Sequence, residues 1–129
     1  MSQATQIDFE RLIVVCCQRH QNVLNLASPI FEEDGFITTA IMAGTGGRFE
    51  IRCGPAEYHA EIFIYTFEDQ KRWNLADLMS IENIRSWMIQ NRPDTGGRSQ
   101  LEAEINYAFW LLTDGLKDVV NFKWLYCFS

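Results

Sequence analysis

The residues best suited to chemistry in this chain are its cysteines and histidines, because thiolates and imidazoles serve as nucleophiles and metal ligands. Cys17 and His20 are three residues apart, a spacing that places them on one side of a helix together with Cys16. Cys53 and His59 lie on either side of a Gly-Pro turn and can face each other. Four such ligands could bind zinc, but the paired C-x-x-C spacing of zinc sites is absent. A buried histidine and buried thiols are therefore the favoured interpretation.

A nucleophilic thiolate is disfavoured at Cys16 and Cys17. A reactive cysteine is normally activated by nearby positive charge or by a helix N-terminus. These two residues fall near the C-terminal end of the helix expected around them, where the helix dipole disfavours a thiolate. The cysteines, Cys127 included, also match no disulfide framework, which favours free thiols in a reducing cytoplasm.

The glycine-rich segment at residues 44–48, GTGGR, does not match a nucleotide-binding loop. A P-loop requires Lys-Ser/Thr after its last glycine, and a dinucleotide fingerprint requires a helix. Here a strand is expected to follow. The segment is therefore interpreted as a hairpin loop whose glycines supply the positive φ of tight turns.

Two acidic groups could act as general acids and bases, since paired carboxylates often do. One consists of Glu32, Glu33 and Asp34, and the other of Glu68 and Asp69. Both fall in expected loops, without the burial that adjusts a carboxylate pKa for catalysis. We interpret them as solvated surface, and as candidate sites for binding a protein.

A long amphipathic helix is expected at residues 99–120. Ser99 and Glu102 form a capping box at its start, and apolar residues recur at helical spacing along it. The stripe that should pack on a sheet consists of Leu101, Ile105, Ala108, Leu112, Leu116 and Val119.

Tyr107, Trp110 and Asp114 fall on the opposite side of this helix. Tyrosine and tryptophan are enriched among the residues that dominate binding energy at protein interfaces, so this side is a candidate interface. The alternative is that Phe122, Trp124 or the first helix covers Trp110.

A first helix is expected at residues 5–21, because its apolar residues share one face. That face consists of Phe9, Leu12, Ile13, Cys16 and His20. The alternative is a buried strand through LIVVCC, a run that is continuous and partly β-branched.

Strands are expected at residues 36–43, 48–53 and 58–67, and the last of these is apolar on both faces, as in a central strand. A charged connection should follow at residues 68–74. The short connections favour an antiparallel meander. A helical turn at residues 75–79 and a short helix at 80–90, capped by Ser80, precede the long helix. An aromatic tail at residues 122–129 should lie back on the core.

The predicted fold class is thus α+β: an antiparallel meander of about four strands packed against the N- and C-terminal helices, in a single domain spanning residues 1–129.

Composition narrows the class of function. The chain has 129 residues and a net charge of −6, which disfavours nucleic acid and anionic membrane surfaces and favours a basic protein partner. No apolar run reaches the roughly 18 residues of a membrane span, and the N-terminus lacks the pattern of a signal peptide. These features predict a cytoplasmic protein without a cofactor or bound metal.

The C-terminal half resembles a family of small bacterial immunity proteins, which are encoded beside polymorphic or contact-dependent growth inhibition toxins. The resemblance rests on W-N-L-A-D-L (Trp73–Leu78), a short helix, and a long helix with the pattern L-E-A-E-I-x-x-A-x-x-L-x-x-x-L-x-x-V-V (Leu101–Val120). It implies a cytoplasmic protein that binds and blocks one cognate toxin domain, often a nuclease, and it assigns no role to any residue.

The leading hypothesis is therefore a non-enzymatic immunity protein that neutralises a toxin, possibly a nuclease, by stoichiometric binding. The candidate partner-binding residues are Glu32, Glu33, Asp34, Glu68, Asp69, Tyr107, Trp110 and Asp114. One alternative is a small cysteine- or metal-dependent enzyme that uses Cys17, His20, Cys53 or His59. The other is a structural module that forms a homodimer through Tyr107 and Trp110.

Overall fold

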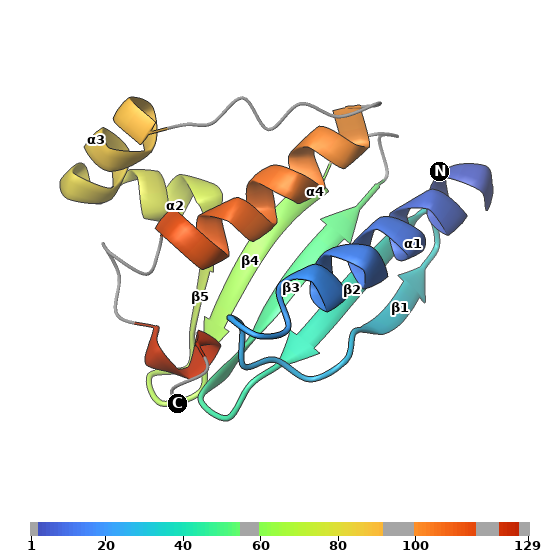
Figure 1. Ribbon diagram of the computed structural model, residues 1–129, viewed down its shortest axis with the longest axis horizontal. Coiled ribbons are helices and arrows are strands. Elements are labelled where there is room, and N and C mark those ends of the chain that lie inside the picture. Colours follow the sequence, from blue (N-terminus) through green and yellow to red (C-terminus); the bar gives the residue numbers. More distant parts are fainter. Residues whose placement is uncertain (1–2, 55–59, 92–99, 116–121, 127–129) are drawn as a thin grey trace.

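A single antiparallel sheet, covered on one face by two helices, forms the body of the protein (Figure 1). The computed structural model describes residues 3–54, 60–91, 100–115 and 122–126. The covering helices are α1 (Gln3–Arg19) and α4 (Gln100–Trp110), which lie side by side across the sheet. The expected α+β class is confirmed.

The sheet has five strands in the order β1-β2-β3-β4-β5, so each strand pairs with the next one in the chain. All four pairings are antiparallel, which confirms the predicted meander. The strands are β1 (Ile30–Asp34), β2 (Ile37–Ala43), β3 (Gly47–Cys53), β4 (Ala60–Thr66) and β5 (Lys71–Asn74).

The two edge strands, β1 and β5, were not among the segments predicted as strands. Residues 31–36 read as a turn around Asp34-Gly35, and residues 68–74 as a charged connection. The turn at Gly35, whose φ is 62°, is confirmed, and residues 68–70 do form a connection, but residues 31–34 and 71–74 are strands. Edge strands often carry charged side chains that discourage pairing with other chains. Strands with so many charged residues do not show the apolar pattern from which strands are predicted.

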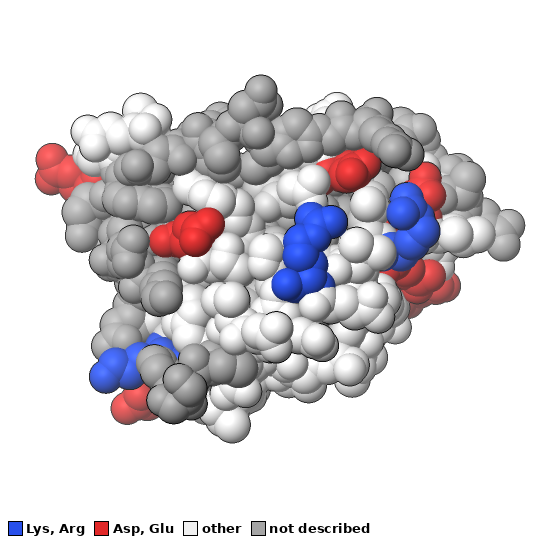
Figure 2. All heavy atoms as spheres, viewed as in Figure 1, with Lys and Arg blue, Asp and Glu red and all other residues white. Residues whose placement is uncertain are grey.

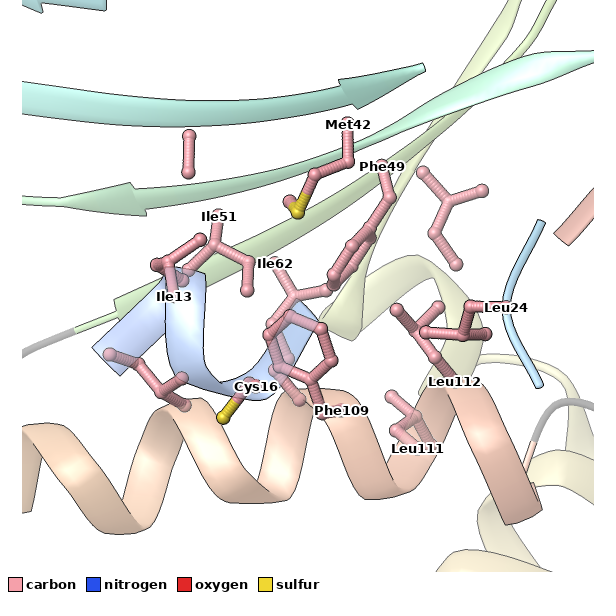
Figure 3. Close-up of a cluster of buried hydrophobic side chains, with 14 of the residues drawn as sticks. Ile13, Cys16, Leu24, Met42, Phe49, Ile51, Ile62, Phe109, Leu111 and Leu112 are labelled. Atoms are coloured by element: carbon pink, nitrogen blue, oxygen red, sulfur yellow. The ribbon is translucent and has the colours of Figure 1, made fainter. Parts of the chain in front are cut away.

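The buried core lies between the sheet and the two helices. Figure 3 shows Met42, Phe49 and Ile51 of the sheet facing Ile13 of α1 and Phe109 of α4. These side chains are at most 1% exposed. Burial on this scale stabilises a fold mainly through the apolar area removed from water.

The face predicted for the first helix is the one that α1 buries. Phe9, Leu12, Ile13 and Cys16 are buried, and His20, just beyond the helix, is half-buried. The alternative of a strand through this segment is wrong. The valines Val14 and Val15 lie outside the apolar face and are partly exposed.

The last helix is regular for a shorter distance than predicted. α4 passes at Trp110 into a π-helical turn, η1 (Leu111–Gly115). The Thr113 hydroxyl donates to the Phe109 carbonyl at 2.9 Å, and the Tyr126 hydroxyl donates to the Leu112 carbonyl at 2.6 Å. Because these hydroxyls occupy carbonyls of the helix end, the regular backbone pattern is interrupted there.

The predicted stripe of this helix is confirmed as far as the structure describes it. Leu101, Ile105, Ala108 and Leu112 are buried. Leu116 and Val119, like the predicted cap Ser99, lie outside the described residues.

Two short helices, α2 (Leu75–Met79) and α3 (Glu82–Asn91), follow β5. Asn74 caps α2 reciprocally with Asp77, at 2.7 Å and 3.0 Å. Ser80 was predicted to cap the start of the helix at residues 80–90. It instead ends α2, because its N–H donates to the Ala76 carbonyl at 3.1 Å.

The C-terminal segment packs on the β2–β3 hairpin, as predicted for an aromatic tail. Its described residues include a 3-10 turn, η2 (Lys123–Leu125), and Tyr126 pairs with Leu24 in an isolated bridge. The Trp124 indole lies against Gly44, Gly46 and Gly47.

The hairpin glycines at residues 44–47 were predicted to supply positive φ, and this explanation is wrong. Among described glycines only Gly35 and Gly54 have positive φ. A Cβ at Gly44 would lie 2.7 Å from Cε3 of Trp124, and one at Gly47 would meet the Tyr65 carbonyl oxygen and lie 2.6 Å from Cζ2 of Trp124. The hairpin therefore needs glycine so that the indole can approach its backbone.

Substituting Gly44 with alanine tests this explanation. We expect Gly44→Ala to lower the free energy of unfolding by about 1–3 kcal/mol, the usual cost of overpacking, as measured by urea denaturation. In a Trp124→Leu background, which removes Cε3, the same substitution should cost less. An equal cost in both backgrounds would contradict the role assigned to the indole.

Candidate partner-binding surfaces

The two acidic groups are exposed but lie far apart. Glu32, Glu33 and Asp34 lie on the edge strand β1, at the end where the chain turns into β2. Glu68 and Asp69 lie in the turn between β4 and β5, beyond the opposite edge of the sheet and at the other end of the strands. The structure therefore does not bring the two groups into one surface.

Some of these carboxylates already have partners within the chain. Gln6 of α1 donates a hydrogen bond to Glu33. The Thr66 hydroxyl donates to Asp69, and this hydrogen bond is the main reason that the pKa of Asp69 lies below its ordinary value. Both carboxylates thus contribute to local structure.

Tyr107 and Trp110 come together on α4, with ring centroids 5.5 Å apart and ring planes at 33°. Both are half-buried and pack against the core, so each ring keeps only part of its surface accessible. Asp114, one turn further along, is exposed. In Figure 2, which shows the helix side, the charged side chains that are drawn are scattered among broad uncharged areas.

Cys16 and Cys17 are held as protonated thiols. Burial raises the pKa of Cys16, whose Sγ lies 3.6 Å from Oδ1 of Asn106. Burial also raises the pKa of Cys17 to about 11, and its Sγ lies 3.5 Å from Sδ of Met42. Neither residue has the thiolate character that nucleophilic catalysis requires at neutral pH.

The residues considered as metal ligands are not gathered within the described part of the chain. There, no three His, Cys, Asp or Glu side chains form a group that could hold a metal ion. Cys53 is buried, whereas His59 and Cys127 lie outside the described residues.

His20 stacks on Phe109, with ring centroids 5.8 Å apart and planes at 13°. Burial lowers the pKa of this imidazole, Arg19 lowers it further, and Asp114 partly opposes both. The folded protein therefore favours neutral His20.

Protonation of His20 should destabilise the fold. Because its folded pKa lies below the ordinary value of about 6.5, the unfolded chain binds this proton more readily. The contribution of neutral His20 to the free energy of unfolding is complete above about pH 6.5 and is lost as the pH falls through the folded pKa. We expect the free energy of unfolding to fall less between about pH 8 and pH 5 in His20→Gln than in the parent protein, in urea titrations.

Asp114→Asn provides the matched variant, because removing this carboxylate should lower the pKa of His20 further and deepen the loss at low pH. An identical pH dependence in the parent protein and His20→Gln would contradict the assignment.

The outer face of the sheet carries a surface that the sequence analysis did not identify. α1 and α4 cover the other face, and strand register places alternate residues of β3, β4 and β5 on the outer one. We call these residues the arginine–aromatic face: Arg48, Glu50, Arg52, Glu61, Phe63, Tyr65 and Arg72.

Guanidinium groups lie over aromatic rings across this face. Arg52 and Arg72 both lie over Phe63, at 5.0 Å and 3.9 Å from the ring centroid, and Arg48 lies over Tyr65 at 4.4 Å. Phe63 is only 7% exposed as a result. Such stacking is favourable because the ring face is electron-rich.

Two of the three arginines also form ion pairs. Arg48 contacts Glu50 at 3.3 Å and Arg52 contacts Glu61 at 3.1 Å. Arg72 is exposed, and no ion pair joins it to a carboxylate among the described residues. With three arginines and two glutamates, the arginine–aromatic face has a net charge of 3 − 2 = +1, in a chain whose net charge is −6.

A sequence signal for this face existed but was incomplete. Glu50 and Arg52 alternate with apolar residues within the strand predicted at residues 48–53, which indicates a side exposed to solvent. The pairing of this side with Phe63 and Tyr65 depends on the β3–β4 register, and Arg72 lies on a strand that was not predicted.

Comparison with known proteins identifies no relative: no family model, no curated protein and no solved structure matches the chain. Among the described helices, none is both long enough and apolar enough to cross a membrane.

Proposed function

We propose that this protein binds and neutralises a protein toxin domain, possibly a nuclease, by stoichiometric contact in the bacterial cytoplasm, without catalysing a reaction. The observation that supports protein binding best is the arginine–aromatic face, which the helices leave uncovered. The identification of the partner as a toxin rests on the resemblance of the C-terminal half to immunity proteins.

The composition of this face is typical of a protein interface. Arginine, tyrosine and phenylalanine are enriched at interface centres, and tyrosine and arginine are common among the residues whose truncation costs most. Here they project from adjacent strands of a paired sheet, so little backbone freedom is lost on binding. Arg72 offers donors for a carboxylate or a backbone carbonyl of the partner.

The charge of the whole chain and that of the face act at different ranges. A net charge of −6 attracts a basic partner over distance and raises the association rate. Once the proteins touch, the arginines of the face form short contacts that slow dissociation. A basic toxin domain with a local acidic or carbonyl-rich patch satisfies both requirements.

The aromatic pair on α4 is a second candidate surface within the same proposal. Tyr107 and Trp110 are accessible only in part, and Asp114 beside them is exposed. They lie on the helix layer, whereas the arginine–aromatic face lies on the outer side of the sheet. Variants can therefore distinguish the two surfaces.

Neutralisation is tested by co-expression with the product of the adjacent upstream gene. We expect that product to inhibit growth when expressed alone, and this protein to restore growth and to co-purify with it in a one-to-one complex. Growth inhibition that this protein does not relieve, or an adjacent product without toxicity, would contradict the proposed function.

The binding surface is tested by Arg72→Glu and Tyr65→Ala, measured by titration calorimetry with that partner. Each should weaken binding at least about tenfold, because each removes an interface-type contact of roughly 1.4 kcal/mol or more. Arg85→Glu, the same charge change on exposed α3, is the matched control and should leave affinity within about twofold. If Trp110→Ala weakens binding while Arg72→Glu and Tyr65→Ala do not, the interface lies on α4 instead.

A further inference from the structure

A pocket of about 340 Å³ opens between α1, the segment that follows it, and α4. Val14 and Cys17 of α1, together with Leu24 and Leu26 of the segment after it, contribute apolar side chains to its lining. Phe109 of α4 also lines the pocket, and Figure 3 shows this ring among the buried side chains of the core. Three separate segments thus line this open pocket with both apolar and polar groups.

The lining carries hydrogen-bonding groups but no ionisable acid or base other than the Cys17 thiol. Gln18 and Ser28 contribute an amide and a hydroxyl, beside the apolar walls. A charged ligand would lose its hydration without gaining a counter-charge from these walls, which is unfavourable. An uncharged apolar ligand would gain from burial, and its polar end could bond to the amide or hydroxyl.

The size of the pocket limits the ligand. A cavity of about 150 Å³ is sufficient to bind benzene, and ligand sites usually begin near 300 Å³. This pocket of about 340 Å³ therefore holds one or two fused rings.

We propose that the pocket formed by Val14, Cys17, Leu26 and Phe109 binds a small uncharged molecule with an apolar body of one or two rings and one hydrogen-bonding end. This inference goes beyond toxin neutralisation and does not depend on it, because the binding test uses no partner protein.

The test uses the purified full chain and 1-aminonaphthalene, a fluorescent probe with two fused rings that is uncharged at neutral pH. We expect saturable binding at one site per chain and displacement of the probe by indole. Indole-3-acetate, which adds a carboxylate to the same ring system, should compete at least tenfold less well, because the pocket supplies no counter-charge. Absence of saturable binding, or equal competition by the anion, would overturn the proposal.

Filling the pocket provides the matched pair of variants. Ala27→Trp places a large side chain in the lining and should weaken probe binding at least tenfold. Ala76→Trp, at an exposed position on α2, should leave binding unchanged. Equal binding by the two variants would overturn the assignment to this pocket.

Cys17 gives an independent measurement in the unmodified protein, even if Ala27→Trp does not fold. Its thiol lines the pocket, so bound indole should slow its alkylation by N-ethylmaleimide several-fold, as read by fragment mass spectrometry. An alkylation rate unaffected by saturating indole would overturn the proposal.

Discussion

The packing of Phe109 joins the parts of this fold. Its ring meets Phe49 of β3 edge-to-face at 6.1 Å and stacks on His20 at the end of α1. Phe109 is 1% exposed, so its buried ring joins α4, the sheet and the end of the first helix. Because both helices are held on the same side of the sheet, the outer side has no covering layer among the described residues. That asymmetry leaves the outer side of the sheet as the proposed surface for partner recognition.

An uncovered sheet face must remain soluble while its strands stay paired. Here Arg52 and Arg72 cover Phe63, and Glu50 and Glu61 neutralise neighbouring guanidinium groups. Exposed ion pairs contribute little to stability, whereas stacking shields an apolar ring without removing the charges from water. In the proposed function, the same side chains supply flat, rigid and hydrogen-bonding groups to a partner. One set of residues thus shields Phe63 and forms the proposed binding surface.

Sequence patterns predicted the elements in which apolar residues recur at the spacing of a helix or a strand. The buried face of α1, strands β2 to β4 and the stripe of α4 all follow from residue periodicity. Features that depend on distant residues were missed: the charged edge strands, the π-helical turn held in part by Tyr126, and the indole that requires Gly44. The arginine–aromatic face was missed for the same reason, since it exists only once the strands are in register.

The central claim, that the outer face of the sheet is the binding surface, is tested most directly by nuclear magnetic resonance. In protein labelled with ¹⁵N, the side-chain Nε signals of Arg48, Arg52 and Arg72 and the indole signal of Trp110 report the two candidate surfaces separately. On addition of the purified, inactivated partner, the account predicts that the arginine signals shift or broaden while the Trp110 signal is unchanged. Perturbation of Trp110 with unchanged arginine signals would contradict it.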